Sequence, residues 1–246
     1  MRKEQNKIGL VAGPCSAETR AQMLETARAL KHIGIKTIRA GLWKPRSRFG
    51  SFEGVGNCGL VWLNEIQQEL GLKVMTEVAL PSHVEETMKA GIDMVWIGAR
   101  TTVNPFMMNE LAESLRGCNI PVWVKNPVCP DIELWVGAVE RLLHAGLKDI
   151  RIIHRGFCAI DHLPYRNVPL WEQVEHFRTR LPDMPFYCDP SHILLSVCEK
   201  ALSLHVDGLF IESHCCPQKA LSDASQQLTP DALAELLNLL NVPIEK

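Results

Sequence analysis

The amino-acid sequence predicts a single-domain (β/α)8 barrel (TIM barrel) over residues 1–246. Eight short apolar runs recur along the chain, segments with helical features lie between them, and no long linker separates the two kinds of segment. The runs are almost continuously apolar, which is typical of parallel strands covered on both faces. A doubly wound sheet needs fewer strands and usually a GxGxxG turn, and Ala12-Gly13-Pro14-Cys15 is not that motif. Eight strand–helix pairs therefore favour a closed barrel.

The predicted strands are short and rich in Val and Ile. They cover residues 8–15, 37–43, 73–78, 94–99, 121–126, 149–156, 185–190 and 208–213.

The predicted helices are recognised by periodicity and by their end signals. An apolar stripe of Met23, Leu24, Ala27 and Leu30 has helical spacing and indicates a first helix. Other helices are expected at 58–70, 105–116, 132–145, 170–180, 193–204 and 230–240.

Two helix starts carry specific signals. Ser82 and Glu85 form a capping-box pattern before a helix that should end near Gly91. Thr229 followed by Pro230 is typical of a helix that begins with proline in its first turn.

Composition restricts the partners and the location. The chain of 246 residues is 46% hydrophobic and carries 26 basic and 28 acidic residues, a formal charge of −2. We therefore expect no binding of nucleic acid or membranes by overall charge. The start of the chain lacks the apolar region of a signal peptide, and no apolar run approaches the length of a membrane span. A cytoplasmic protein without disulfides is expected, because the nine cysteines are odd in number and contain no CxxC pair.

Polar residues recur where the predicted strands end. The chemistry of this fold lies at those carboxyl ends, so residues far apart in sequence should meet at one rim. Charged side chains are costly near a core unless they are paired or solvated, so this placement favours a site. The residues concerned are Cys15, Arg39, Lys44, Glu77, Arg100, Lys125, His154, Arg155, Asp189, His192, Glu212 and His214.

Four of the polar residues could together bind a divalent metal. One thiolate, one imidazole and two carboxylates are a sufficient ligand set, supplied here by Cys15, His192, Glu212 and Asp223. Each residue alone also has a structural explanation, as a core, capping or ion-pairing group. Jointly they favour a metal site, and mixed S, N and O ligands leave Mn²⁺, Fe²⁺, Co²⁺ and Zn²⁺ open.

Several cations should face the same mouth. Arg39, Lys44 and Arg46 lie within eight residues, and further cations follow later strands. Such a group would repel itself without anions, which indicates phosphorylated substrates. A Lys amid cations should also have a depressed pKa, which would suit Lys44 to proton donation.

Five motifs resemble the 3-deoxy-D-arabino-heptulosonate 7-phosphate (DAHP) synthase family over nearly the whole chain. The resemblance is strongest to the short type I beta group, especially forms joined to a chorismate mutase domain. Val124-Lys125-Asn126-Pro127-Val128 and His154-Arg155-Gly156-Phe157 point to that subgroup. The five motifs are Ala12-Gly13-Pro14-Cys15-Ser16, Lys44-Pro45-Arg46-Ser47, Ile97-Gly98-Ala99-Arg100, Asp189-Pro190-Ser191-His192 and the stretch from Leu221 to Pro230.

The resemblance implies a metal-dependent condensation of phosphoenolpyruvate with D-erythrose 4-phosphate and water, giving DAHP and phosphate in the first step towards aromatic amino acids. It implies Cys15, His192, Glu212 and Asp223 as metal ligands, and Lys44, Cys15, His192 and Glu77 as catalytic residues. Phosphoenolpyruvate would meet Arg39, Lys44, Arg100, Lys125 and Arg155, with Ala99 and Asp189 nearby. Erythrose 4-phosphate would meet Pro45, Arg46 and Ser47.

The chain departs from the family pattern in three ways. The segment after His192 is shorter by about half a dozen residues, and it leads directly into a predicted helix. No amino-terminal regulatory extension and no mutase domain are expected in residues 1–246. The resemblance also implies a homo-oligomer, a dimer or a tetramer, and is compatible with a chorismate mutase domain or partner elsewhere.

Two other functions stay open at this stage. The sister enzyme 3-deoxy-octulosonate 8-phosphate synthase uses arabinose 5-phosphate and normally has Lys-Ala-Asn-Arg where this chain has Lys44-Pro45-Arg46-Ser47. That difference favours the four-carbon sugar. A non-catalytic barrel that binds a sugar phosphate would not need the four metal ligands, all of which are present in the sequence.

Overall fold

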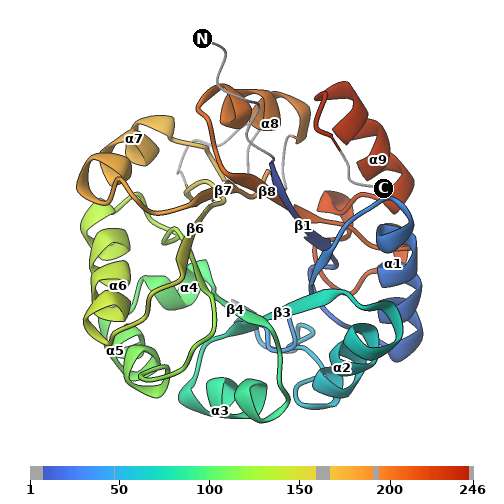
Figure 1. Ribbon diagram of the computed structural model, residues 1–246, viewed down its shortest axis with the longest axis horizontal. Helices are drawn as coiled ribbons and strands as arrows, with labels where there is room; N and C mark the ends of the chain where they lie inside the picture. Colours follow the sequence, from blue (N-terminus) through green and yellow to red (C-terminus); the bar gives the residue numbers. More distant parts are fainter. Residues whose placement is uncertain (1–7, 47, 159–166, 191–193, 244–246) are drawn as a thin grey trace.

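The computed structural model describes residues 8–46, 48–158, 167–190 and 194–243. Eight parallel strands follow one another around a closed barrel, and β1 pairs with β8 to complete it. Figure 1 looks into this ring, with the helices outside the strands. The predicted (β/α)8 barrel is therefore confirmed.

Every predicted strand has a counterpart in the barrel. Residues after several strands were predicted as strand but form loops, because these residues leave the barrel to line its mouth. The strands are β1 (Gly9–Gly13), β2 (Thr37–Arg39), β3 (Lys73–Val78), β4 (Met94–Ile97), β5 (Val122–Lys125), β6 (Ile150–His154), β7 (Phe186–Cys188) and β8 (Gly208–Glu212).

The helices lie close to their predicted ranges. They are α1 (Arg20–His32), α2 (Cys58–Leu70), α3 (Pro81–Lys89), α4 (Ala99–Thr102), α5 (Pro105–Ser114), α6 (Ile132–His144), α7 (Trp171–Arg180), α8 (Leu194–Ser203) and α9 (Pro230–Leu239). The one-turn helix α4 was not predicted. Two short 3₁₀ helices, Pro217–Lys219 and Ala224–Gln226, lie between β8 and α9.

One helix start was correct and one was wrong. Thr229 caps α9, since its side chain accepts a hydrogen bond from the backbone N of Ala232. The capping box at Ser82 is absent: the N-cap of α3 is Leu80, without a side-chain cap, and Pro81 occupies the first turn. Proline there fixes φ and needs no hydrogen bond to its nitrogen, so the helix begins two residues earlier than the box predicts.

Two apolar cores flank the strands. On β3, Met75 points into the barrel, whereas Val74 and Val78 pack towards the helices, as the two-residue period of a strand requires. The inner core consists of Val11, Met75, Met94, Trp96, Trp123, Ile153, Tyr187 and Phe210. These large side chains fill the barrel, so a ligand can bind only at one of its ends.

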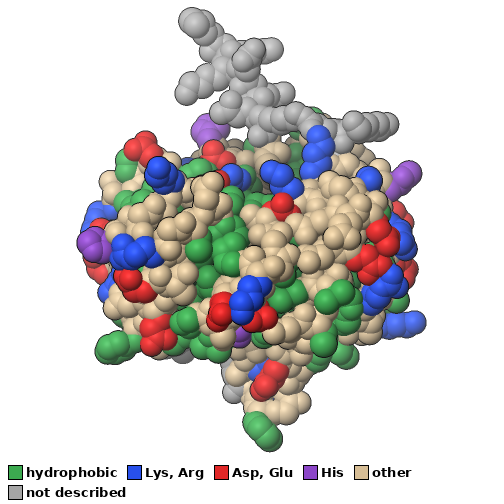
Figure 2. Space-filling view, turned by 60° about the horizontal axis from the view of Figure 1, so that its bottom comes forward, with side chains coloured by type: hydrophobic (Ala, Val, Ile, Leu, Met, Phe, Trp, Pro, Cys, Tyr) green, Lys and Arg blue, Asp and Glu red, His purple; other side chains and the backbone are tan. Residues whose placement is uncertain are grey.

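The outer wall carries mixed charge. In the view of Figure 2, basic and acidic side chains alternate over the helices, in keeping with the formal charge of −2. Among the described residues, no helix has both the length and the apolar character that crossing a membrane requires. All nine cysteines are free.

Candidate active site

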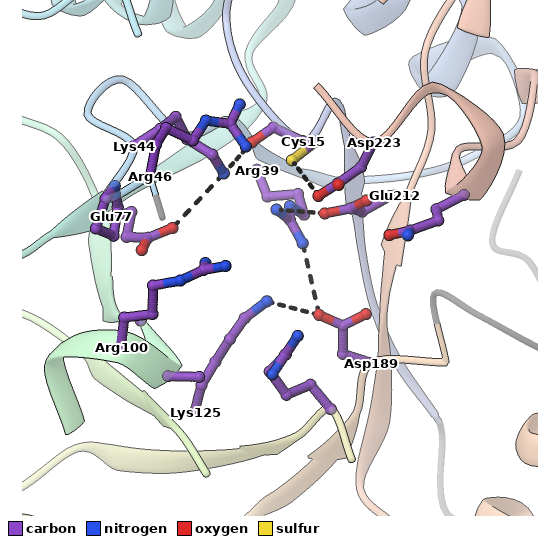
Figure 3. Close-up of a pocket in the computed structure, with 15 residues that line it drawn as sticks. Cys15, Arg39, Lys44, Arg46, Glu77, Arg100, Lys125, Asp189, Glu212 and Asp223 are labelled. Carbon is purple, nitrogen blue, oxygen red and sulfur yellow. Dashed lines mark hydrogen bonds and ion pairs between the residues drawn. The ribbon is translucent and has the colours of Figure 1, made fainter. Parts of the chain in front are cut away.

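A polar pocket opens at the carboxyl ends of the strands. Its lining includes every described residue that was predicted to bind metal or substrate or to act in catalysis; Ser47 and His192 lie outside the described residues. Six cations line it, Arg39, Lys44, Arg46, Arg100, Lys125 and Arg155, together with the four carboxylates Glu77, Asp189, Glu212 and Asp223. Figure 3 labels all of these residues except Arg155 and shows that the labelled side chains come from opposite sides of the barrel and point into one space.

Three of the four predicted metal ligands lie together. The parallel pairing of β1 with β8 sets Gly13 opposite Glu212, which brings the segment after β1 to the end of β8. One donor atom each from Cys15, Glu212 and Asp223 lies within 4.8 Å of the other two. The Cys15 thiol donates to Asp223 Oδ2 at 3.3 Å.

The electrostatics of this trio suit a cation. The pKa of Cys15 is raised to about 12, chiefly by burial and then by the neighbouring Glu212. Burial is also the main cause of the raised pKa of Glu212, despite the nearby Arg39. Glu212 Oε2 is buried and has no hydrogen-bond partner among the described residues. Negative charge is thus unfavourable here until a cation arrives, so the donor set fits a divalent metal.

Arg39 forms the floor of the pocket. Its guanidinium is 3.2 Å from Glu212 Oε1 and 3.8 Å from Asp189 Oδ2. It also lies 4.4 Å from the ring centre of Phe210 and 5.0 Å from that of Trp96. Two of its nitrogens, Nε and Nη1, have no hydrogen-bond partner among the described residues. A buried guanidinium with open donors is suited to an anion.

Lys125 is the second buried cation of the floor. Its Nζ donates to Asp189 Oδ2 at 2.6 Å and lies 5.1 Å from the ring centre of Phe210. Burial lowers the pKa of Lys125, Asp189 partly offsets this effect, and Arg39 adds to it. Lys125 is therefore the lysine of this pocket with a depressed pKa.

Lys44 corrects a sequence expectation. Its Nζ donates to the backbone O of Cys15 at 3.0 Å and lies 3.8 Å from Glu77 Oε2. Burial would lower the pKa of Lys44, but the acidic groups around it, Cys15 and Glu77 foremost, raise it above the ordinary value. The predicted depression was wrong because the nearest neighbours of Lys44 are acids, which the order of residues in the sequence does not reveal.

Glu77 and Gly98 fix each other's place. Trp96 Nε1 donates to Glu77 Oε2 at 3.2 Å, and a Cβ on Gly98 would overlap Glu77 Oε1.

Arg100 was expected at the end of a strand but lies in the short helix α4, with Ala99 at its start. The turn of α4 brings both residues to the pocket.

The loop between β2 and α2 carries the other anion-binding candidates. Lys44 N donates to Glu53 O at 2.8 Å, and Arg46 Nε donates to Phe52 O at 2.7 Å. Arg46 Nη2 is buried without a hydrogen-bond partner among the described residues. Pro45 lies between these residues on the pocket wall.

Arg155 reaches the pocket from the end of β6. Its backbone N donates to the side chain of Asn126 at 2.7 Å, and Asn126 Nδ2 also donates to Gly156 O at 2.8 Å. Asn126 therefore ties the ends of β5 and β6 together and fixes where Arg155 leaves the barrel.

Two strand-end histidines do not line the pocket. His154 packs against Trp171 and Phe157, with ring centres 5.1 and 5.7 Å away. His214 accepts a hydrogen bond from Cys216 N at 2.8 Å. His154 faces away from the barrel interior because its neighbour Ile153 belongs to the inner core and side chains alternate along a strand. His214 lies beyond the end of β8.

Sequence reasoning missed the glutamines between β8 and α9. Gln226 lines the pocket, and Gln227 is bonded to the backbone N of Cys15 at 2.9 Å. Both residues lie in the motif that ends at Pro230, but an uncharged amide gives no chemical signal of its own in a sequence.

Comparisons with known proteins place this pocket in a family. The sequence model of the DAHP synthetase I family matches residues 2–243. A phospho-2-dehydro-3-deoxyheptonate aldolase of Thermotoga maritima is 30% identical over 239 residues, covering 93% of this chain and 67% of the relative. A 2-dehydro-3-deoxyphosphooctonate aldolase of Nitratidesulfovibrio vulgaris is 27% identical and covers 94% of this chain and 90% of the relative.

Solved structures agree with the sequence matches. The crystal structure of the phospho-2-dehydro-3-deoxyheptonate aldolase (DAHP synthase) from Thermotoga maritima has a TM-score of 0.85 and 28% identity, covering 96% of this chain and 69% of that one. A truncated form of the 3-deoxy-D-arabino-heptulosonate 7-phosphate synthase from the same organism has a TM-score of 0.80 and 26% identity, covering 96% and 86%. The chain therefore belongs to the DAHP synthetase I family, and it is a transferase of the DAHP synthase type.

Proposed function

We propose that this chain condenses phosphoenolpyruvate with D-erythrose 4-phosphate and water, giving DAHP and phosphate, with one divalent metal ion. The observation that carries the proposal is one pocket in which six cations surround the Cys15, Glu212 and Asp223 cluster. Two phosphorylated substrates supply the anions that these cations require. A cytoplasmic location and a homo-oligomeric state stay predictions.

The two floor cations are suited to phosphoenolpyruvate. Arg39 and Lys125 are almost fully buried, with side chains 1% and 11% exposed, and both contact Asp189. A phosphate or carboxylate that enters the pocket would take over part of the pairing of these two cations with Asp189. Because the site is almost closed to solvent, pairing of charges there is stronger than in water. Arg100 and Arg155 border the same space and would enclose the substrate from the α4 and β6 sides.

The β2–α2 loop is suited to the phosphate of the aldose. Arg46 keeps one nitrogen on its own loop and has an open donor, so the guanidinium is oriented before a ligand binds. Pre-orientation lowers the entropy cost of holding the aldehyde carbon against the enol carbon. Ser47 is proposed to join Arg46 at this phosphate.

The reaction needs one proton at the aldehyde oxygen. A carbon–carbon bond forms between the methylene carbon of phosphoenolpyruvate and the aldehyde carbon, which leaves a cation at the carbon that bears the phosphate. Water adds to that carbon and releases a proton, which balances the one taken up at the aldehyde oxygen. The C–O bond to phosphate then breaks, and the proton of the new hydroxyl leaves with the phosphate. Lys44 is proposed to give the proton, because its ammonium lies in the pocket beside the backbone O of the candidate metal ligand Cys15. Its raised pKa makes it a weaker acid than an ordinary lysine, so position and not acidity supports this role. Glu77 would hold that ammonium towards the pocket.

Cys15, Glu212 and Asp223, with His192, would hold the metal. When bound, a divalent ion supplies Lewis-acid stabilisation of negative charge on the substrate oxygen.

Phosphate release tests the proposal. The purified chain is mixed with phosphoenolpyruvate and Mn²⁺, and with erythrose 4-phosphate or arabinose 5-phosphate in parallel, with and without a chelator. We expect release with the four-carbon sugar, lost on chelation and restored by Mn²⁺. A preference for arabinose 5-phosphate would instead make this a 3-deoxy-octulosonate 8-phosphate synthase. No release with either sugar would favour the non-catalytic barrel.

A variant locates the aldose phosphate. Arg46→Ala should raise the KM for erythrose 4-phosphate by about 10-fold or more, because a charge-assisted hydrogen bond contributes roughly 1.5–3 kcal/mol. The KM for phosphoenolpyruvate should change far less. Arg116→Ala is the control, since Arg116 pairs with Glu113 on the outer wall and its side chain is 49% exposed. Equal effects on both KM values would refute the assignment of Arg46.

A further inference from the structure

Two segments from opposite ends of the sequence are tied together beside the candidate metal ligands. The first follows β1 and contains Cys15, Ser16 and Glu18; the second follows β8 and contains Asp223. Glu18 Oε1 accepts from the backbone N of Leu221 at 2.8 Å. The hydroxyls of Ser16 and Ser222 are hydrogen-bonded to each other. These ties surround the Cys15–Asp223 contact drawn in Figure 3.

Gln227 uses both ends of its amide in this connection. Its Oε1 accepts from the backbone N of Cys15 at 2.9 Å, and its Nε2 donates to the backbone O of Ser222 at 2.9 Å. The residue is buried, with 7% exposure, so water competes little for either bond. One side chain therefore fixes the backbone of one candidate ligand and the residue directly before another.

Asp223 needs such support. Its φ of 49° and ψ of 38° place its backbone in the left-handed region, which residues other than glycine occupy only rarely. Such a conformation persists only where the surroundings determine it. Here Ser222 is held by Gln227 on one side, and Asp223 O accepts from Gln226 N at 2.9 Å on the other. Without the Gln227 contact, we expect Asp223 to relax and its carboxylate to move away from Cys15.

We propose that Gln227 is a positioning residue that sets the spacing of Cys15 and Asp223 for the metal. The inference rests on the proposed metal site. Residues that orient metal ligands typically contribute 10–100-fold to metal affinity. Removing the amide of Gln227 should therefore raise the Kd of the metal by about that factor, while kcat at saturating metal changes much less.

The test follows Co²⁺ binding to metal-free protein. Gln227→Met keeps the volume of the side chain and removes both hydrogen bonds. Binding is measured from the thiolate-to-cobalt charge-transfer band, with a competing chelator to obtain Kd. Gln218→Leu is the control, because Gln218 is exposed on the same β8–α9 segment. For Gln227→Met, we expect the band to be weaker at a given Co²⁺ concentration and to reach its wild-type intensity only at high Co²⁺. For Gln218→Leu, we expect the same titration as for the wild type.

The outcomes separate this inference from the proposed function. If the wild-type chain shows no thiolate band, the metal site itself fails. If the wild type shows the band and Gln227→Met has a Kd within twofold of it, only the positioning role is refuted. Should Gln227→Met fail to fold, Gln227→Asn replaces it. This side chain is shorter by one methylene and cannot reach both Cys15 N and Ser222 O, so the Kd should rise several-fold, and an unchanged Kd would overturn the proposal.

Discussion

Arg39→Met should destabilise the metal-free protein far more than an ordinary surface substitution. Arg39 is 1% exposed at its side chain and lies between Glu212 and Asp189, which are 7% and 3% exposed. Removing one partner of a buried ion pair leaves an uncompensated charge and costs about 3–5 kcal/mol. Methionine refills much of the volume between Trp96 and Phe210, so the cost is chiefly electrostatic.

Arg151→Met is the matched control. Arg151 also lies over a tryptophan, with its guanidinium 5.3 Å from the ring centre of Trp123, and it also has an acidic partner, Asp149 at 2.9 Å. The two side chains of this pair are 31% and 45% exposed, however. Exposed pairs contribute about 0–1 kcal/mol, so this variant should lose no more than about 1 kcal/mol.

Urea unfolding in the presence of a chelator measures both variants. The midpoint for Arg39→Met should fall by about 1 M or more, given the slope expected for a chain of this size. A loss below about 1 kcal/mol, or one equal to that of Arg151→Met, would show that the floor carboxylates do not depend on Arg39.

The pH dependence of the deficit provides an independent check. Burial already raises the pKa of Glu212, and removing Arg39 removes the largest influence that lowers it. A carboxyl whose pKa is raised in the folded state lowers the stability of the protein only when it must be charged. No stability is lost below the pKa of the unfolded state, and the loss grows as pH rises through the pKa of the folded state. The deficit of Arg39→Met should therefore shrink towards pH 5 and grow towards pH 8.

Two further predictions concern packing in and around the pocket. Gly98→Ala should lower kcat by about 100-fold, because its Cβ would displace the Glu77 carboxylate, whereas Gly137→Ala, which meets only the flexible end of Arg141, should not. Burial lowers the pKa of His154 to about 3, so its contribution to stability is present above pH 6.5 and is lost as pH falls towards 3. Between pH 7 and pH 5, His154 should lower the free energy of unfolding of the wild-type protein by about 2 kcal/mol. His154→Phe should lack this loss. The same dependence of the unfolding free energy on pH in the two proteins would refute this.

The fold was predictable because it depends on local apolar patterning. All eight strands are marked by short apolar runs and most helices by helical stripes or end signals, and the barrel follows from their order. The helix α4 escaped prediction because its four residues give no periodic signal. The start of α3 was misplaced because Pro81 and Ser82 both favour a helix start: proline in the first turn sets the N-cap at Leu80, whereas the capping box would set it at Ser82.

The charged residues of the pocket were predictable from the sequence, but their pairing was not. The rule that strand ends share one rim brought Cys15, Glu77 and Glu212 together without any distance information. Which acid meets which cation depends on angles around the barrel. The sequence therefore predicted a depressed pKa for Lys44, whereas the depression belongs to Lys125. His192 and Ser47 keep their predicted roles as proposals, since they lie outside the described residues.

The charge balance of the pocket connects the metal to both substrates. Six cations against four carboxylates leave the described lining with a formal charge of +2. Phosphoenolpyruvate carries a phosphate of about −1.5 to −2 and a carboxylate, about −2.5 to −3 in all, so it leaves the metal-free pocket slightly negative. A bound divalent ion adds two positive charges and the Cys15 thiolate that would bind it removes one, so the same complex becomes nearly neutral and repels a second phosphate less. Metal binding should accordingly strengthen the binding of erythrose 4-phosphate. By reciprocal linkage, the aldose phosphate should strengthen the binding of the metal.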